Sequence, residues 1–254
     1  MKQLTHLSLF SGIGGLDLAA EWAGFTTVGQ CEWADYPTKV LEKHWPNTER
    51  WRDIRDVTKE DFTRRTGLRS VDIVSGGFPC QPFSTNGHRN GEDDDRYLWP
   101  EMLRVISEVK PTWVIGENVA GIISMALDKV CSDLEAEGFE VQPIVLPACS
   151  AGALHRRDRV FFIANSANNR CEHSKYAEGR SHKKQRQEES TPIERSLIVD
   201  EREFREQVRT AEFIRAANGI PNRMDRIKCL GNAVVPQQVY PIFRAIAEIE
   251  RSAE

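Results

Sequence analysis

The sequence of 254 residues lacks any long hydrophobic run. A membrane-spanning helix needs roughly 18 or more apolar residues in succession, and no stretch approaches that length. The first six residues, MKQLTH, carry one basic residue and no apolar core, so they do not resemble a signal peptide. We therefore expect no membrane partner and a cytoplasmic location.

Paired cysteines are also missing. The six cysteines are scattered and include no C-x-x-C pair: Cys31, Cys80, Cys131, Cys149, Cys171 and Cys229. Such spacing predicts neither a disulfide framework nor a zinc site. We expect no bound metal and a reducing environment.

An overall excess of basic residues is absent too, because the net charge is -4. That value alone argues against a nucleic-acid partner. The distribution is uneven, however: residues 155–228 hold 17 Lys and Arg against 12 Asp and Glu, and the remainder is acidic. Binding to phosphates follows the local field, so charge alone leaves open a phosphate-binding segment or a solvated, charge-rich insert.

Short hydrophobic segments alternate with segments of helical spacing. Strands are predicted over residues 4–10, 27–31, 71–75, 112–116, 139–146 and 160–164, and helices over 16–23, 97–109, 122–137 and 236–249. This alternation predicts an α/β fold with a Rossmann-like, doubly wound and mostly parallel sheet. Ligands of such sheets bind at the carboxyl ends of the strands.

The composition changes after residue 165. Residues 166–218 are polar and charged, with few apolar residues and no clear period, whereas order resumes near residue 219. We therefore divide the chain into a main domain over 1–165, a short insert over 166–218, and a C-terminal segment over 219–254 that returns to the main domain. No internal repeat is seen.

A glycine loop, Phe10-Ser11-Gly12-Ile13-Gly14-Gly15, follows the first predicted strand and precedes a helix. Glycines there let the backbone approach a ligand closely. Glu32 ends the second strand, where a carboxylate can accept hydrogen bonds from ribose hydroxyls. The pattern favours a nucleoside cofactor over a dinucleotide, because it is not a full G-x-G-x-x-G; a tight structural turn is the alternative.

The sharpest feature is the loop Gly76-Gly77-Phe78-Pro79-Cys80-Gln81-Pro82. Its prolines make it rigid and extended, and the preceding strand places it in the ligand crevice. A thiolate presented in this way is a strong nucleophile, whereas a packing cysteine usually lies within a strand or helix. Glu117 ends another strand, where partial desolvation can raise the pKa of a carboxyl group and make it a proton donor.

Two further segments carry polar residues near predicted strand or helix ends. His155-Arg156-Arg157-Asp158-Arg159 precedes an apolar strand, and alternation predicts Arg157 and Arg159 on one face, suited to a phosphate or a polarised carbonyl. A charge cluster at a strand edge is the alternative. The segment 231–236 is predicted to be a small-residue turn before the last helix, where Asn232 either starts that helix or closes over a ligand.

In this order, the motifs resemble those of the C5-cytosine-specific DNA methyltransferases, which depend on S-adenosylmethionine. The resemblance covers residues 4–164 and 219–250, and Pro79-Cys80-Gln81 followed by Glu117-Asn118-Val119 is its most specific part. It implies the methyltransferase fold, with catalysis and cofactor binding in residues 1–165 and target recognition in 166–218. The insert is short for a recognition domain.

The resemblance implies that Cys80 attacks carbon 6 of a cytosine flipped out of the DNA stack. Glu117 would hold N3 and the exocyclic amine and protonate N3. Arg159, with Arg157, would support the base carbonyl and the catalytic loop. The product would be 5-methylcytosine in a short duplex site.

The resemblance also implies the residues that bind S-adenosylmethionine and its product, S-adenosylhomocysteine. Glu32 would bind the ribose, Trp33 would stack on the adenine, and Asp53 with Ile54 would meet the adenine edge. The remaining expected contacts are Phe10, Gly12, Ile13, Gly15, Gly77, Pro79, Leu98, Asn232 and Val234. Two positions depart from the usual family pattern: His155 stands where many members have Gln, and Arg96-Tyr97-Leu98 lacks one spacer residue.

As partners, the resemblance implies double-stranded DNA and a separately acting restriction endonuclease, as in restriction-modification systems. The protein itself would be a monomer in a bacterial or phage-infected cell. Alternatives are a tRNA cytosine methyltransferase on the same scaffold, a catalytically impaired DNA-binding homologue, and a nicotinamide-dependent enzyme. The last leaves the Cys80 loop unexplained, and an amino-group DNA methyltransferase would need an Asn/Asp-Pro-Pro-aromatic loop in its place.

Overall fold

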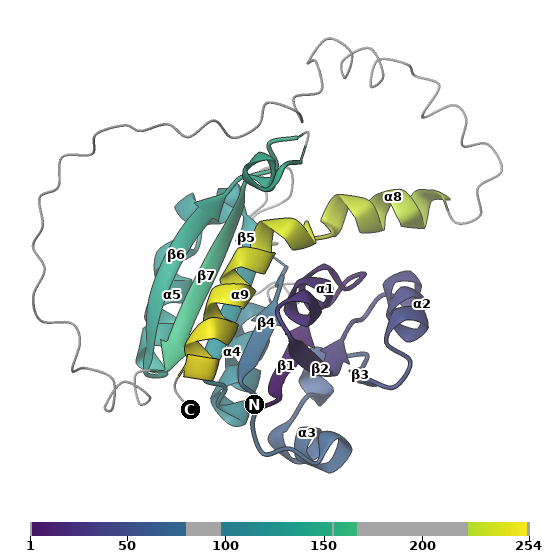
Figure 1. Ribbon diagram of the computed structural model, residues 1–254, viewed down its shortest axis with the longest axis vertical. Coiled ribbons are helices and arrows are strands. Elements are labelled where there is room, and N and C mark those ends of the chain that lie inside the picture. Colours follow the sequence, from purple (N-terminus) through teal and green to yellow (C-terminus); the bar gives the residue numbers. More distant parts are fainter. Residues whose placement is uncertain (1, 80–97, 154, 167–222, 253–254) are drawn as a thin grey trace, which may run out of the picture. The chain divides into compact units, whose positions relative to one another are not determined.

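The computed structural model describes residues 2–79, 98–153, 155–166 and 223–252 (Figure 1). Residues 1–171 and 229–254 form one compact unit, and residues 172–228 form a second. Within the second unit only residues 223–228 are described, in the first part of helix α8. No helix in the described ranges is both long and apolar enough to cross a membrane.

A seven-stranded sheet forms the centre of the first unit, in the order β3-β2-β1-β4-β5-β7-β6. The strands are β1 (Leu4–Leu9), β2 (Phe25–Cys31), β3 (Glu49–Trp51), β4 (Ile73–Gly76), β5 (Trp113–Val119), β6 (Phe139–Leu146) and β7 (Arg159–Ser166). The pairs among β1 to β5 are parallel, whereas β7 is antiparallel to both of its neighbours. The predicted α/β fold with a mostly parallel sheet is confirmed.

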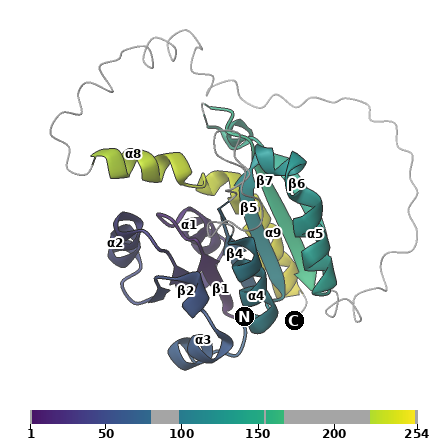
Figure 2. The same ribbon diagram turned by 180° about the vertical axis from the view of Figure 1, so that it is seen from behind.

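Helices connect the strands and cover both faces of the sheet (Figures 1 and 2). Those of the first unit are α1 (Gly15–Trp22), α2 (Asp35–His44), α3 (Lys59–Thr66), α4 (Trp99–Val109), α5 (Leu127–Ala136) and α9 (Pro236–Ser252). Helix α8 (Arg223–Asn232) contains residues of both units. Short 3-10 turns lie at η1 (Ile54–Asp56), η3 (Ala120–Ser124) and η4 (Ala148–Ala151).

Alternating side chains of the strands divide the core into two clusters. Ile73 and Ile115 face α1 and α9, whereas their strand neighbours Val74 and Val114 face α4 and α5. This alternation is what a sheet buried on both sides requires. On the first of these faces α9 packs along α1, so the end of the chain lies beside its beginning (Figure 1).

Several predicted boundaries are wrong. The segment predicted to be a helix over residues 122–137 is divided into η3 and α5. Gly231 and Asn232, predicted to form a turn, are the last residues of α8, and only residues 233–235 link α8 to α9. The elements α2, β3 and α3 were not predicted; they fill the interval between β2 and β4 and add an edge strand beside β2.

Candidate active site

The carboxyl ends of the parallel strands meet at one edge of the sheet. Leu9 at the end of β1 pairs with Cys31 on one side and with Gly76 on the other, and Gly76 pairs with Gly116. Consequently the glycine loop, Glu32 and the start of the Cys80 loop follow neighbouring strands at this edge, where parallel α/β sheets bind ligands. Glu117, predicted to follow its strand, instead lies within β5, next to Gly116.

Left-handed backbone conformations shape the glycine loop. Phe10, Gly12 and Gly14 have φ values of 52°, 55° and 87°. The loop is tied to the end of β2, because the Ser11 amide donates to the Cys31 carbonyl at 3.0 Å. A methyl group on Gly14 would overlap the Trp45 ring, whereas the position of such a group on Gly12 is open. The loop therefore needs glycine at Gly14 for packing and leaves free space at Gly12.

A buried polar network links the elements that flank the glycine loop. Asp17 on α1 is fully buried and accepts hydrogen bonds from Ser8 at 2.9 Å and Gln30 at 2.8 Å. Arg50 donates to Gln30 at 3.0 Å and also to the carbonyl of Trp45, the residue whose ring covers Gly14. Burial raises the pKa of Asp17 to about 6, although both hydrogen bonds oppose the shift.

Glu32 lies against the glycine loop. One of its carboxylate oxygens accepts from the Gly12 amide at 2.8 Å, and the other accepts from the Ala34 amide at 2.8 Å. Each oxygen keeps lone-pair capacity for a hydroxyl donor. Beside it Trp33 is 69% exposed, so its indole is open to a ligand.

Asp53 and Ile54 lie at the start of η1. The Asp53 carboxylate caps this turn by accepting from the Arg55 amide at 2.9 Å, and it also pairs with the Arg55 guanidinium at 2.7 Å. The Ile54 side chain is 3% exposed and belongs to the core. Of this pair, the Asp53 side chain, which is 19% exposed, is therefore the part that a ligand can reach.

Glu117 is an acid at this edge whose pKa is strongly raised. Its side chain is buried, and Arg159 Nε lies 2.8 Å from Oε1. Burial raises the pKa of Glu117 to about 7, against the opposing effects of the positive charges on Arg159 and Arg157. Gly77 faces the other carboxylate oxygen, and a Cβ there would lie 3.0 Å from Oε2. The absence of a side chain at Gly77 thus leaves room for the acid.

Cys80 lies outside the described residues, but the two residues before it are described. Asn118 Nδ2 donates to the Phe78 carbonyl at 3.0 Å, and the Phe78 ring packs on Trp99 with centroids 4.9 Å apart. The backbone leading into Pro79 is therefore fixed directly to the residue after Glu117. No role was predicted for Asn118, although a buried amide beside an acid near a strand end needs a partner.

The expectation that Arg157 and Arg159 share one strand face is wrong. Strand β7 begins only at Arg159, and Arg157 has a φ of 38°, so strand alternation does not reach it. Its guanidinium instead donates to the carbonyls of Gly231 and Ala233, each at 2.7 Å. Arg157 therefore holds the link between α8 and α9, while its charge still acts on Glu117.

The remaining predicted cofactor residues lie in three places. Leu98 precedes α4 and packs against the core. Ile13, Gly15 and Val234 line a cavity of about 630 Å³, whose walls also include Leu18 and Trp45, whereas Glu32 and Trp33 lie outside it. A Cβ on Gly15 would lie 2.5 Å from the Val234 carbonyl, so glycine permits this close approach. Asn232 is exposed at the end of α8.

Among the described residues no His, Cys, Asp or Glu cluster fits a metal ion.

Comparison with known proteins decides the family. A family model described as C-5 cytosine-specific DNA methylase matches residues 4–211. The chain belongs to this family. The predicted family and the methyltransferase fold are thereby confirmed.

Relatives of the chain include the type II methyltransferase M.HgiCII of Herpetosiphon aurantiacus, 35% identical over 168 residues, which cover 64% of this chain and 37% of the relative. M.PspPI of Psychrobacter sp. is 37% identical over 169 residues, covering 64% and 39%. The match therefore spans less than half the length of these two relatives.

Solved structures of similar fold include methyltransferases. A putative DNA modification methyltransferase encoded within an E. coli prophage has a TM-score of 0.58 at 28% identity, covering 66% of this chain and 48% of that one. Spodoptera frugiperda DNMT2 has a TM-score of 0.55 at 23% identity, covering 65% and 51%. The second likeness concerns the fold alone.

Proposed function

We propose that the protein transfers a methyl group from S-adenosylmethionine to carbon 5 of a flipped cytosine in a short duplex DNA site, through a covalent adduct with Cys80. The observation that carries this proposal is the buried Glu117, whose pKa is raised to about 7, beside the backbone that leads into Cys80. A nucleophile and a proton donor on neighbouring strand ends are what addition to a cytosine ring requires.

The chemistry begins at carbon 6, because carbon 5 of cytosine is itself a poor nucleophile. The Cys80 thiolate forms a bond to carbon 6, the ring electrons move to N3, and N3 takes a proton from Glu117. The resulting enamine makes carbon 5 nucleophilic. When bound, S-adenosylmethionine supplies an electrophilic methyl group and leaves as S-adenosylhomocysteine. Loss of the carbon 5 proton to a base then re-forms the double bond between carbons 5 and 6 and expels the Cys80 thiolate, and the N3 proton returns to Glu117.

The surroundings of Glu117 suit this role. With a pKa near 7, Glu117 is protonated in about half of the molecules at neutral pH. Arg159 contacts one carboxylate oxygen and orients the group, and Gly77 leaves the other oxygen unobstructed by a side chain. Arg157 and Arg159 supply positive charge that favours the carboxylate left after proton transfer.

The donor set fits a nucleoside cofactor. Glu32 offers carboxylate oxygens to ribose hydroxyls, Gly12 leaves open space beside it, and Trp33 exposes an aromatic face for the adenine. We assign Asp53 and Ile54 to the adenine edge. The other proposed contacts are Phe10, Ile13, Gly15, Gly77, Pro79, Leu98, Asn232 and Val234.

We further propose that residues 1–165 carry catalysis and cofactor binding, that 166–218 recognise the DNA site, and that 219–254 return to the catalytic domain. Residues 167–222 lie outside the described part of the chain. The type II methyltransferase names of the relatives support a place in a restriction-modification system, with a separate endonuclease as partner. The protein would act as a monomer in the cytoplasm.

Transfer of a radiolabelled methyl group tests the proposal. Wild type should label unmethylated duplex DNA in preference to tRNA in direct competition, and Cys80→Ser should bind S-adenosylhomocysteine with unchanged affinity but label neither. Turnover by Cys80→Ser would overturn the covalent mechanism. Preferential labelling of tRNA would keep the chemistry and replace the substrate.

A further inference from the structure

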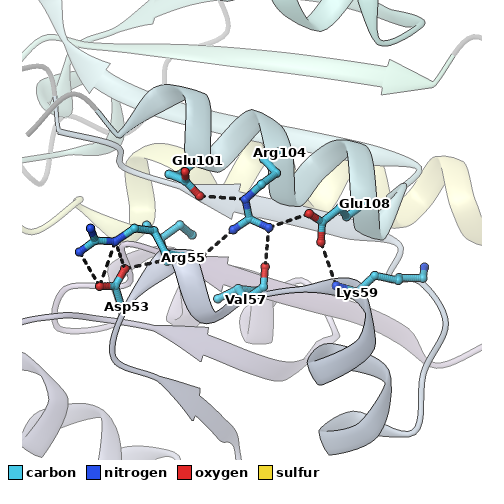
Figure 3. Close-up of polar contacts among 8 residues, drawn as sticks. Asp53, Arg55, Val57, Lys59, Glu101, Arg104 and Glu108 are labelled. Carbon is cyan, nitrogen blue, oxygen red and sulfur yellow. Dashed lines mark hydrogen bonds and ion pairs between the residues drawn. The ribbon is translucent and has the colours of Figure 1, made fainter. Parts of the chain in front are cut away.

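The turn that carries Asp53 and Ile54 is held from outside by one arginine of helix α4. Arg104 Nη2 donates to the Ile54 carbonyl at 3.0 Å, and Nη1 donates to the Val57 carbonyl at 3.1 Å (Figure 3). These carbonyls lie at the beginning and just after the end of η1, so a single guanidinium spans the whole turn.

Two carboxylates of the same helix fix the guanidinium. Glu101 accepts from Arg104 Nε at 2.8 Å, and Glu108 accepts from Nη1 at 2.7 Å (Figure 3). The second oxygen of Glu108 accepts from the Lys59 amide at 2.9 Å, at the first turn of α3. Partial burial lowers the pKa of Arg104, but the bonds to Glu108 and Glu101 outweigh it and hold the pKa above its usual value.

Helix α4 also reaches the other end of the proposed cofactor site. Its first residues follow Leu98, and Met102 packs under Gly76, where an added Cβ would lie 3.1 Å from the Met102 sulfur. Gly76 is the last residue of β4, directly before Gly77. Arg104 thus ties the Asp53–Ile54 turn to the same rigid helix that supports the backbone leading to Cys80.

We propose that Arg104 is a positioning residue for the adenine end of the cofactor. It contacts no ligand, and it acts by fixing where the Asp53–Ile54 turn stands relative to α4. This inference rests on the proposed cofactor, and it adds a residue outside the expected binding set. Arginine suits the task because its planar fork can serve two carbonyls and two carboxylates at once, whereas lysine has one nitrogen.

Loss of the Arg104 contacts with the Ile54 and Val57 carbonyls affects recognition of the adenine edge. The proposed turn meets the adenine amino group, which S-inosylhomocysteine replaces with a carbonyl oxygen. A fixed turn discriminates between these two ligands, because the Asp53 carboxylate, which is 19% exposed, can accept from an amino group but is repelled by a carbonyl oxygen placed against it. A loose turn adapts to either ligand and loses the preference.

The experiment measures the dissociation constants of S-adenosylhomocysteine and S-inosylhomocysteine by calorimetry, on the full chain. In Arg104→Met we expect about tenfold weaker binding of S-adenosylhomocysteine and a loss of most of the preference over the inosyl ligand. Arg104→Lys should be intermediate. The KM for DNA should stay within about twofold of wild type, since the turn does not face DNA in this proposal.

Arg244→Met is the matched control. Arg244 on α9 makes the same i,i+4 pair with a glutamate, Glu248 at 2.8 Å, but its side chain is 63% exposed. This variant should bind both ligands as wild type does.

Thermal unfolding separates positioning from general stability. If Arg104→Met lowers the melting temperature yet keeps wild-type affinity and preference, Arg104 is only structural and the inference is overturned. If wild type binds S-adenosylhomocysteine and only the Arg104 effect is absent, the proposed function survives. If wild type itself does not bind S-adenosylhomocysteine, both proposals fall.

Discussion

Replacing Glu117 with glutamine should make the protein more stable at alkaline pH while it abolishes most of its activity. The pKa of Glu117 is raised by burial from 4.5 to about 7. A carboxyl group with a raised folded-state pKa favours the protonated form. Its contribution to stability is therefore complete below pH 4.5 and is lost as the pH rises through 7.

The size of the effect follows from the shift. Each pKa unit corresponds to 1.36 kcal/mol, so ionisation of Glu117 lowers the free energy of unfolding by up to about 3 kcal/mol between pH 4.5 and pH 8. Glutamine carries no charge at any pH, and its amide oxygen can still accept from Arg159. Glu117→Gln should therefore gain up to about 3 kcal/mol over wild type at pH 8 and much less at pH 5.

Activity should change in the opposite direction. Glutamine cannot give a proton to N3 of cytosine, so single-turnover methyl transfer should fall by about 10²- to 10⁴-fold. The affinity for S-adenosylhomocysteine should stay the same. In wild type the rate should decline as the pH rises above 7, because the protonated fraction of Glu117 declines.

Urea unfolding at pH 5 and pH 8, together with single-turnover assays, measures both effects. Glu248→Gln is the control, because that side chain is 62% exposed and pairs with Arg244 on the surface. An equal stability difference between Glu117→Gln and wild type at both pH values would refute the burial argument. Turnover near the wild-type rate would refute the role as proton donor.

Two further changes test the support of the glycine loop. Gly15→Ala places a methyl group 2.5 Å from the Val234 carbonyl. It should lower the free energy of unfolding, measured in urea, by about 1–3 kcal/mol and weaken S-adenosylhomocysteine binding. The control Gly231→Ala, with open space around its Cβ, should do neither. Wild-type affinity in Gly15→Ala would contradict this packing. Asp17→Asn removes a buried acid with a pKa raised to about 6, a group whose stabilising effect is lost as the pH rises from about 4 to 6. The variant should therefore gain stability over wild type between pH 4 and pH 7, and an unchanged pH profile would count against it.

The ends of β1 and β2 were predictable because hydrophobic strands alternate with helices, and a glycine loop or an acidic residue marks where each stops. Strand β5 was predicted to stop at Gly116 but continues to Val119, because Glu117 to Val119 pair with β7. The elements between β2 and β4 were not predictable from the sequence. Helix α2 buries only Thr38 and Leu41, and α3 buries only Phe62, so neither carries a clear hydrophobic stripe. Strand β3 has three residues, too few for an alternating pattern.

Side-chain partnerships were harder to predict than elements. Arg157 precedes an apolar strand, and nothing local indicates its positive φ or its contact with carbonyls more than seventy residues later. Arg104 has glutamates three residues before and four after it, a pattern typical of a solvated helix face. Its contacts with the Ile54 and Val57 carbonyls depend on how α4 packs, which the helix alone does not indicate.

Bisulfite sequencing tests most directly whether this protein methylates carbon 5 of cytosine in DNA. Methylation-free plasmid is incubated with the purified protein and S-adenosylmethionine, with Cys80→Ser as the parallel control. We predict protected cytosines in one short recurring context with wild type and complete conversion with Cys80→Ser. Complete conversion with a wild-type protein that binds S-adenosylhomocysteine would contradict DNA cytosine methylation.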